Sequence, residues 1–434
     1  MRAEDAVPAR GIDDERRIQS LCRRSLPRFS YSATQVPRKI RFKGPRKESP
    51  HTRNSALPRF LHTADWQIGR QYSQFPADDA VPLAEARFAV VETVAHLATE
   101  HSVDAVLVAG DVFDAQTVSD RTIRKLFNAL QGYAGPWLMI PGNHDAALTE
   151  SVWARAQRLG AIPSNLYLAL NSQILDFSAQ GFAVFAAPLT QRHTYNDLSE
   201  WFDHAETAPG VLRIGLAHGS VQGVLAEDID STNPIGAARA ARARLDYLAL
   251  GDWHGCKQID SRTWYSGTPE PDRFKGNEPG YALLVEVGAP GAEPSVTRIE
   301  TGQFRWQAWD ETVAVASDVD AFITLLADVG ARDVLRIRIA GQIDLAGLQR
   351  LRAALSHTEA RVRSVQADLT ALRLSPTADD IAALKADGYL ADVIADLRDR
   401  QAGPEGDATA EVASHALGLL AGILTERQAA GAVA

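Results

Sequence analysis

Residues 105–114 read AVLVAGDVFD, and this stretch shows most clearly how the chain is expected to fold. Ala105–Ala109 is a wholly apolar run, of the kind that forms a strand buried on both faces of a sheet. Gly110 and Asp111 follow directly, so a carboxylate stands just past the expected strand. Ligand-binding groups of sheet-based folds collect in the loops that follow strands. Asp111 is therefore a candidate functional residue, although a simple turn would also place an aspartate there.

The same arrangement, an apolar run followed by a polar residue that can bind a metal, recurs along the chain. Helical patterns at Leu83–Thr99 and Asp120–Leu130 separate the runs, and Ser119 is positioned to cap the second helix. This alternation predicts an α/β fold in which sheet layers are flanked by helices. The runs and their polar residues are Phe60–Ala64 with Asp65, Trp137–Ile140 with Asn143, Leu212–Ala217 with His218, and Tyr247–Leu250 with Asp252 and His254.

Six metal-capable side chains thus fall at strand ends, where they are expected to meet at one edge of the sheets. Each has an ordinary explanation by itself, because a lone aspartate usually stabilises a turn and a lone histidine usually lies at the edge of a core. Their order and shared location favour a metal centre instead. The mixed oxygen and nitrogen donors suit Mn²⁺, Fe²⁺ or Zn²⁺, and the share of oxygen favours Mn²⁺. The six are Asp65, Asp111, Asn143, His218, Asp252 and His254.

The character of the sequence changes near residues 302–303. A strand at Val334–Ile339, a helix at Leu345–Leu355 and a further strand within Val362–Leu372 predict a small, separate β-α-β domain. Beyond Pro376 the pattern is helical and includes Glu411–Gln428.

Composition places the chain among soluble globular proteins of two or three domains, since it has 434 residues, 45% hydrophobic and 23% charged. No apolar run is long enough for a membrane helix, and the N-terminus lacks the apolar core of a secretory signal, so a cytoplasmic location is expected. Two cysteines fit a reducing compartment. The charge is uneven, because residues 1–59 carry a balance of +9 and the remainder a balance of −18. If the substrate is DNA, a metal site, a local basic strip or a partner must supply the attraction.

Residues 1–57 form a basic segment rich in Arg, Ser and Pro, without a helical or strand period. A basic arm that contacts phosphates would have this composition. A transit peptide would be similar, but it would lack acidic residues such as those at 13–15. The third alternative is a segment foreign to the natural protein: Met1 and Met139 are the only methionines, so a start near Leu57 needs a non-standard codon. We expect a disordered or non-native segment.

Taken in order, the polar motifs resemble the signature of the calcineurin-like metallophosphoesterase superfamily. Within it, the segments at 62–66 (HTADW), 108–114 (VAGDVFD) and 265–271 (YSGTPEP) are similar to those of the SbcD-like DNA repair exonuclease group. The resemblance implies a four-layer α/β/β/α sandwich as the catalytic domain over residues 58–302, a capping domain over 303–375 and a C-terminal helical region over 376–434. The motifs are Asp65-x-Gln67, Gly110-Asp111-x-x-Asp114, Gly142-Asn143-His144-Asp145, His218-Gly219 and Gly251-Asp252-x-His254.

The resemblance also implies two divalent cations bridged by Asp111. His144 would not be a ligand; it would face the phosphate and protonate the leaving oxygen, with Asp145 as its orienting partner. The first cation would be held by Asp65, Gln67, Asp111 and His254, and the second by Asp111, Asn143, His218 and Asp252.

Gln67 and Asp252 depart from the pattern, because most relatives have histidine at both positions. Two imidazoles are replaced by oxygen donors, and one of these is charged. The expected site is therefore harder, with Mn²⁺ the most suitable ion, Mg²⁺ the alternative and Zn²⁺ less favoured.

For function, the resemblance implies a DNA exonuclease or endonuclease that acts in repair with an SbcC-like coiled-coil ATPase. The C-terminal helices could dock this SMC-like partner, or they could pack on their own domain. Two alternatives are a phosphodiesterase or phosphatase for nucleotides or other small molecules, and a non-catalytic scaffold. A homodimer is a further expectation from the resemblance.

Overall fold

The structure, a computed structural model, describes residues 58–224, 232–383, 388–403 and 408–432. The segment predicted to be disordered or non-native, residues 1–57, lies outside the described residues. Within these ranges, every helix is too short or too polar to cross a lipid bilayer.

The first sheet has six strands in the order β14-β13-β1-β2-β3-β4. Strands β1 to β4 are parallel, and β13 and β14 extend the sheet in antiparallel fashion. All residues of β2 are buried, as its wholly apolar sequence predicts. The strands are β1 (Arg59–Thr63), β2 (Ala105–Ala109), β3 (Trp137–Ile140), β4 (Leu166–Leu168), β13 (Tyr281–Glu286) and β14 (Ser295–Glu300).

The second sheet also has six strands, in the order β11-β12-β10-β7-β6-β5. Its four central strands are parallel, and β5 and β11 form antiparallel edges. The strands are β5 (Gln173–Phe177), β6 (Phe182–Ala187), β7 (Leu212–His218), β10 (Tyr247–Gly251), β11 (Lys257–Gln258) and β12 (Thr263–Tyr265); β8 (Ser220–Val221) and β9 (Pro234–Ile235) form a separate pair.

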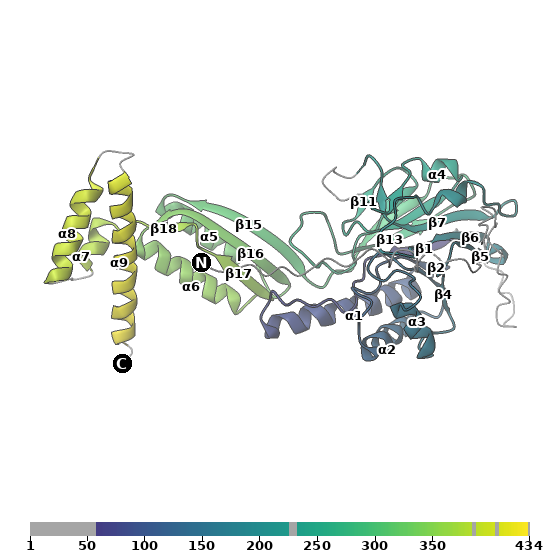
Figure 1. Ribbon diagram of the computed structural model, residues 1–434, viewed down its shortest axis with the longest axis horizontal. Helices are drawn as coiled ribbons and strands as arrows, with labels where there is room; N and C mark the ends of the chain where they lie inside the picture. The colour runs from purple at the N-terminus through teal and green to yellow at the C-terminus, as the bar shows by residue number, and fades with distance from the viewer. Residues whose placement is uncertain (1–57, 225–231, 384–387, 404–407, 433–434) are drawn as a thin grey trace, which may run out of the picture. The chain divides into compact units, whose positions relative to one another are not determined.

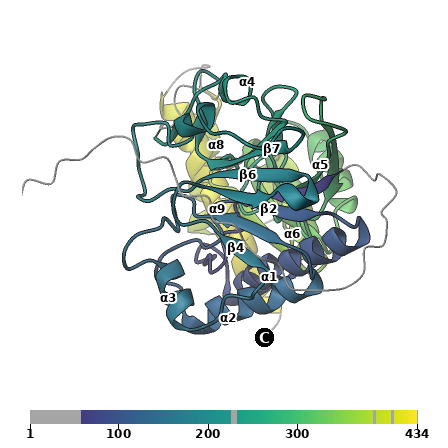
Figure 2. The ribbon, with the colours of Figure 1, turned by 90° about the vertical axis from the view of Figure 1, so that its right-hand side faces the viewer.

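Three hydrophobic clusters show that sheets and helices form four layers. Side chains alternate along a strand, so Val106 of β2 packs on helices, whereas Leu107 packs on the second sheet. The outer face of the second sheet packs on η3 (Glu200–Asp203) and α4 (Arg239–Arg242). Figure 2 shows α4 on one side of the strands and α1 to α3 on the other. The predicted α/β/β/α sandwich is confirmed. The helices on the first sheet are α1 (Ala77–Glu100), α2 (Asp120–Ala129) and α3 (Val152–Arg158), and two 3₁₀ turns are η1 (Leu130–Gly132) and η2 (Ser178–Gln180).

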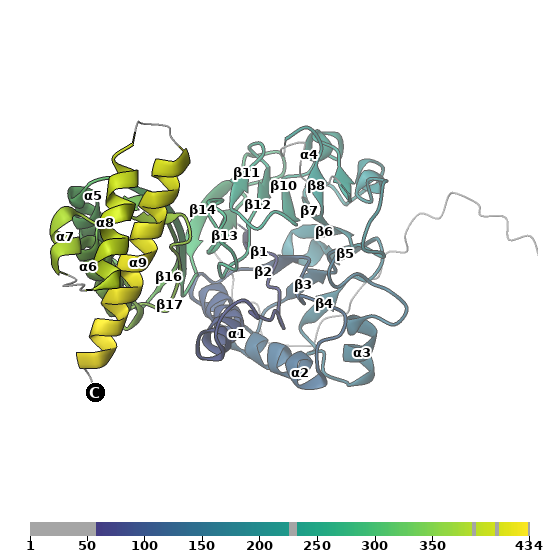
Figure 3. The ribbon, with the colours of Figure 1, turned by 60° about the vertical axis from the view of Figure 1, so that its left-hand side comes forward.

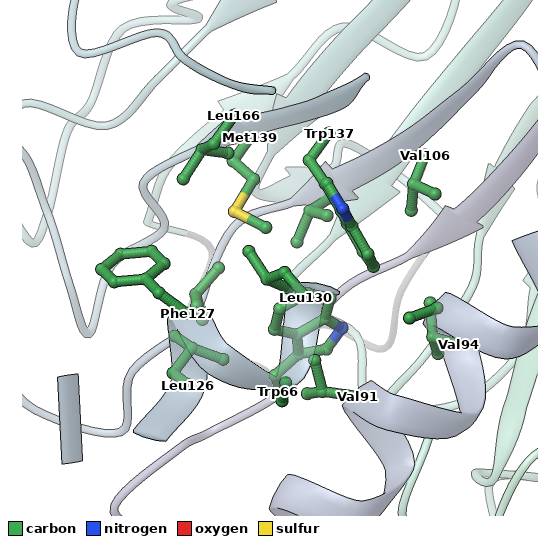
Figure 4. Close-up of a cluster of buried hydrophobic side chains, with 14 of the residues drawn as sticks. Trp66, Val91, Val94, Val106, Leu126, Phe127, Leu130, Trp137, Met139 and Leu166 are labelled. Atoms are coloured by element: carbon green, nitrogen blue, oxygen red, sulfur yellow. The ribbon is translucent and has the colours of Figure 1, made fainter. Parts of the chain in front are cut away.

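Large side chains join the first sheet to its helices. Trp66 and Trp137 are fully buried and meet edge to face, with ring centroids 5.9 Å apart. Figure 4 shows the Trp66 indole beside Val91 of α1. Trp66 directly follows Asp65, and its indole nitrogen donates to Thr63 Oγ1 at 2.9 Å. This packing therefore fixes the start of the loop that carries Asp65.

A separate four-stranded parallel sheet occupies residues 305–374 (Figure 1). The sequence predicted its β-α-β part, and the structure adds a strand and a helix before that unit. The added strand β15 escaped prediction because only Val313 of its residues is buried. The elements are β15 (Arg305–Val313), α5 (Ala316–Ala327), β16 (Asp333–Ile343), α6 (Leu345–Glu359), β17 (Ser364–Asp368) and β18 (Leu372–Leu374).

The C-terminal region is helical, as predicted, and α8 and α9 lie side by side (Figure 3). Ala421 of α9 is buried against Leu345. Other apolar residues of α9 remain exposed: Val412 by 69%, Leu419 by 58% and Ile423 by 55%. The helices are α7 (Ala378–Ala383), α8 (Tyr389–Gln401) and α9 (Ala408–Ala432).

Candidate metal centre

The loops that leave β1, β2 and β10 hold their polar residues in a strained backbone conformation. The φ angles are 55° at Asp65, 51° at Gln67, 52° at Asp111 and 101° at Asp252. Positive φ is uncommon outside glycine and costs about 1–3 kcal/mol for each residue. In the described chain, eight non-glycine residues have positive φ, and four of them are predicted ligands. Because such outliers concentrate at functional sites, the backbone independently marks residues that the sequence had singled out.

Gly110 and Gly142 allow the loops that follow β2 and β3 to approach each other and His218 closely. A Cβ atom added at Gly110 would lie 2.4 Å from His218 Nδ1, and one at Gly142 would lie 2.2 Å from Asp111 Oδ1. Gly110 also has a φ of 88°, which favours glycine. Only glycine leaves enough space before Asp111 and before Asn143, because any side chain at Gly110 or Gly142 would overlap a residue of the site.

His218 lies among the donors predicted for the second cation. Its Nε2 is 3.1 Å from Asn143 Oδ1, 3.6 Å from Asp111 Oδ1 and 3.7 Å from Asp252 Oδ1. Its Nδ1 lies 2.8 Å from the carbonyl oxygen of Ala109. A carbonyl oxygen can only accept, so Nδ1 donates, and Nε2 of the neutral ring keeps its lone pair for a metal. The residues present therefore fit the second cation.

The electrostatics of the site also favour bound positive charge. Burial lowers the pKa of His218, but the carboxylates of Asp111, Asp252 and Asp65 outweigh it and raise that pKa to about 9. Burial, helped by the charges of Asp111 and Asp252 and opposed by His254 and His218, raises the pKa of Asp65 to about 6. Ligand atoms of Asp65, Asp111 and His218 all lie within 4.8 Å of one another. Several acidic groups in so small a buried space are stabilised by a cation.

The amide of Asn143 can face the site with either atom. With its oxygen inward it faces only acceptor atoms of Asp111 and His218. With its nitrogen inward it would donate to the two Asp111 oxygens at 3.0 and 3.1 Å. A cation between these residues would select the oxygen, because only the oxygen has a lone pair to offer.

Gln67, which the resemblance implies as a ligand of the first cation, lies beside the carboxylate of Asp111. Its Nε2 donates to Asp111 Oδ2 at 2.8 Å. Its Oε1 is buried and has no hydrogen-bond partner among the described residues. A buried amide oxygen without a partner is costly, and a bound cation would satisfy it. Asp65, Gln67 and Asp111 therefore fit part of the first cation's predicted ligand set.

His254 is held by residues outside the predicted ligand set. Its Nδ1 is 2.8 Å from Arg273 Nη2 and 3.2 Å from Asp272 Oδ2. Asp272 is 1% exposed and also lies 3.5 Å from Arg70 Nη1. Burial raises the pKa of Asp272, but His254 and the nearby arginines outweigh it and hold that pKa well below its usual range. Arg70, Asp272 and Arg273 thus form a rim of the site. The sequence did not indicate this rim, because the similar segment at 265–271 ends just before Asp272.

His144 lies at the edge of the centre with its ring fixed by the backbone. Its amide N–H donates to Asp111 Oδ1 at 2.9 Å, and its Nδ1 lies 2.8 Å from the carbonyl oxygen of Asp114. Nδ1 is therefore the donor in this contact. Nε2 lies 3.9 Å from Asp111 Oδ2, and the side chain is 32% exposed. A protonated ring can thus offer its second proton, on Nε2, to a group that enters from solvent.

Asp145 holds the loop rather than the ring of His144. Its Oδ1 accepts from the Gly142 amide at 2.7 Å, and its Oδ2 accepts from the amides of Val112 and Phe113 at 2.9 and 3.1 Å. The expected direct contact with the His144 ring is replaced by the Asp114 carbonyl. Burial, reinforced by the charge of Asp111, raises the pKa of Asp145 to about 7. We infer that Asp145 acts on His144 only by positioning its loop.

Replacing Asp145 by alanine is expected to destabilise the protein by about 3 kcal/mol, because buried amide groups lose their acceptor. Asp145→Asn keeps one carbonyl oxygen, so its expected cost is smaller. Urea unfolding at pH 8, where the carboxyl group is ionised, measures both variants. An alanine variant as stable as the wild type would show that the loop does not depend on this side chain.

Comparison with known proteins gives a family match and several similar proteins. A family model described as calcineurin-like phosphoesterase matches residues 58–285. The DNA double-strand break repair protein Mre11 of Methanosarcina acetivorans is 27% identical over 264 residues, which is 57% of this chain and 39% of that protein. The SbcD subunit of nuclease SbcCD from Bacillus subtilis is 25% identical over 338 residues, covering 68% of this chain and 83% of the relative. The SbcD subunit from Rhodobacter capsulatus is 43% identical over 94 residues, which is 20% of this chain and 22% of the relative. The chain thus spans less than half of the Mre11 relative.

Proposed function

The chain belongs to the calcineurin-like phosphoesterase family, and from this premise we propose that it is a metal-dependent phosphodiesterase that cleaves DNA during repair. The observation that carries the proposal is the cluster of Asp65, Asp111 and His218 with the His144 ring at its edge. Relatives named as DNA repair proteins and nucleases support DNA as the substrate.

Divalent ions would be held chiefly by Asp111, Asn143, His218 and Asp252, with Asp65 and Gln67 offering further oxygens. Such ions neutralise an anionic phosphodiester and lower the pKa of water, so that hydroxide is available at neutral pH. The family and the donor set support Mn²⁺ as the natural ion, with Mg²⁺ as the alternative.

The ring of His144 is suited to protonate the leaving oxygen. Its Nδ1–H is committed to the Asp114 carbonyl, so the transferable proton is the one on Nε2. After transfer the ring is neutral and keeps its bond to Asp114. The His144 amide donates to Asp111. Asp111, as a metal ligand, would therefore also position His144 as the general acid.

The rim of the site, formed by Arg70, Asp272 and Arg273, places two arginines close to the acidic cluster. Arg70 and Arg273 stand beside Asp272 and remain 25% and 37% exposed. Arginine binds phosphate oxygens through paired N–H groups. These two residues therefore support an anionic polymer as the substrate.

We also propose an SbcC-like coiled-coil ATPase as the partner. The name of the Bacillus subtilis relative describes one subunit of a nuclease complex. Val412, Leu419 and Ile423 are exposed on α9, and their spacing is typical of a helix that packs on another helix. A single apolar stripe of this kind fits a coiled-coil partner.

Purified protein with Mn²⁺, incubated with end-labelled duplex DNA and separately with bis-p-nitrophenyl phosphate, tests the proposed function. Asp111→Asn protein, prepared identically, controls for contaminating nucleases. Cleavage of both substrates by the wild type alone supports a DNA nuclease. Cleavage of the small diester alone would favour the alternative suggested by the −18 balance beyond residue 59, a small-molecule phosphodiesterase. Cleavage of neither by folded protein would contradict an enzymatic role.

Mn²⁺ is expected to support faster hydrolysis than Zn²⁺, because Gln67 and Asp252 offer oxygen at positions where the family pattern has histidine in most relatives. Initial rates with each ion at matched free concentrations measure the preference. The double variant Gln67→His/Asp252→His should move the preference towards Zn²⁺. Wild-type protein that is equally or more active with Zn²⁺ would refute this prediction.

A further inference from the structure

Arg273 is fixed against the ring of His254. Its Nε and Nη2 donate to the two oxygens of Asp272, each at 3.0 Å. Its Nη2 also lies 2.8 Å from His254 Nδ1 and 3.2 Å from His254 Nε2. The buried Asp272 therefore determines where the guanidinium sits.

This contact affects what His254 can bind. Both ring nitrogens lie within 3.2 Å of Arg273 Nη2, so the nitrogen that carries the lone pair faces a permanent positive charge. A guanidinium does not lose its proton in proteins. A divalent ion on this imidazole would sit beside that charge, and such repulsion is strong in a partly buried site.

Gln67 weakens the same position further. Its nitrogen donates to Asp111 Oδ2 at 2.8 Å, so Gln67 can offer an ion there only its neutral Oε1. By contrast, the donors predicted for the second cation surround His218 Nε2 at 3.1 to 3.7 Å. The two halves of the centre are thus unequal.

We propose that the centre holds one tightly bound divalent ion, at Asp111, Asn143, His218 and Asp252, and that Arg273 supplies the second positive charge. The Arg273 side chain remains 37% exposed, so an incoming phosphate can reach it. The substrate phosphate is then held between the ion and Arg273. This inference rests on the proposed function only in assigning the site to divalent ions and phosphate.

Metal stoichiometry tests the proposal without measuring hydrolysis. Metal-free protein is titrated with Mn²⁺, and free Mn²⁺ is followed by its electron paramagnetic resonance signal. Wild-type protein should bind one ion per chain tightly and a second at least about tenfold more weakly. Arg273→Ala should tighten the second ion about tenfold or more and should give the signal of a coupled ion pair. Arg273→Gln, which keeps more of the packing, should act in the same direction.

Arg298→Ala is the matched control, because Arg298 pairs with Glu278 and is similarly exposed, at 41%. It should leave both affinities unchanged. Wild-type protein that binds two ions with similar affinity, or folded Arg273 variants that leave the second affinity unchanged, would overturn the proposal. A protein that binds one ion but cleaves nothing would overturn the proposed function and leave this inference standing.

Discussion

Replacing Asp111 by asparagine is expected to lower kcat by about 10²- to 10⁴-fold while the fold remains intact. Asparagine tolerates the left-handed conformation that Asp111 adopts, with φ of 52°. The change removes the charge shared by both halves of the centre, and several kcal/mol of charge stabilisation corresponds to this range of rates. The measurements are kcat with Mn²⁺ and the amount of bound Mn²⁺.

Asp120→Asn is a suitable control, because Asp120 lies on α2 with its side chain 58% exposed. It should leave turnover near the wild-type value. An Asp111→Asn enzyme that retained full activity would show that the Asp111 carboxylate is not at the reacting centre.

Replacing His144 by alanine is expected to cost about 10²–10⁴ in rate on DNA while metal binding is retained. The side chain contributes no proposed ligand, but it carries the proton for the leaving oxygen. A p-nitrophenolate group leaves without a proton, so the loss on bis-p-nitrophenyl phosphate should be much smaller. Rates on both substrates, together with metal content, measure the role.

The outcome separates acid catalysis from a structural effect. Equal losses on the two substrates would argue against proton donation by His144. Loss of bound metal from the variant would make His144 part of the metal site instead.

Much of the fold could be predicted because the central strands β2, β3, β6 and β10 are buried on both faces and read as apolar runs. The run at Ala105–Ala109 became β2, and the cap predicted at Ser119 is present, with the hydroxyl oxygen accepting from the Thr122 amide. Strand β15 could not be predicted in this way. Its side chains are largely exposed, so its place depends on pairing with β16 rather than on local hydrophobicity.

The cluster of candidate ligands could be predicted because its side chains share one location in the chain, just past strand ends. The rim could not be predicted, since Asp272 and Arg273 contact His254 only after the chain has folded. The carbonyl that accepts from the His144 ring belongs to the backbone of Asp114. Every residue has such a carbonyl, so this contact could not be predicted from the sequence. The positive φ at Gln67 likewise reflects loop geometry imposed by the fold.

Anomalous scattering at the manganese absorption edge, from crystals grown with Mn²⁺, tests the central claim most directly. The account predicts a strong peak enclosed by Asp111, Asn143, His218 and Asp252. A map with no peak between these side chains, or with its strongest peak elsewhere on the protein, would contradict it.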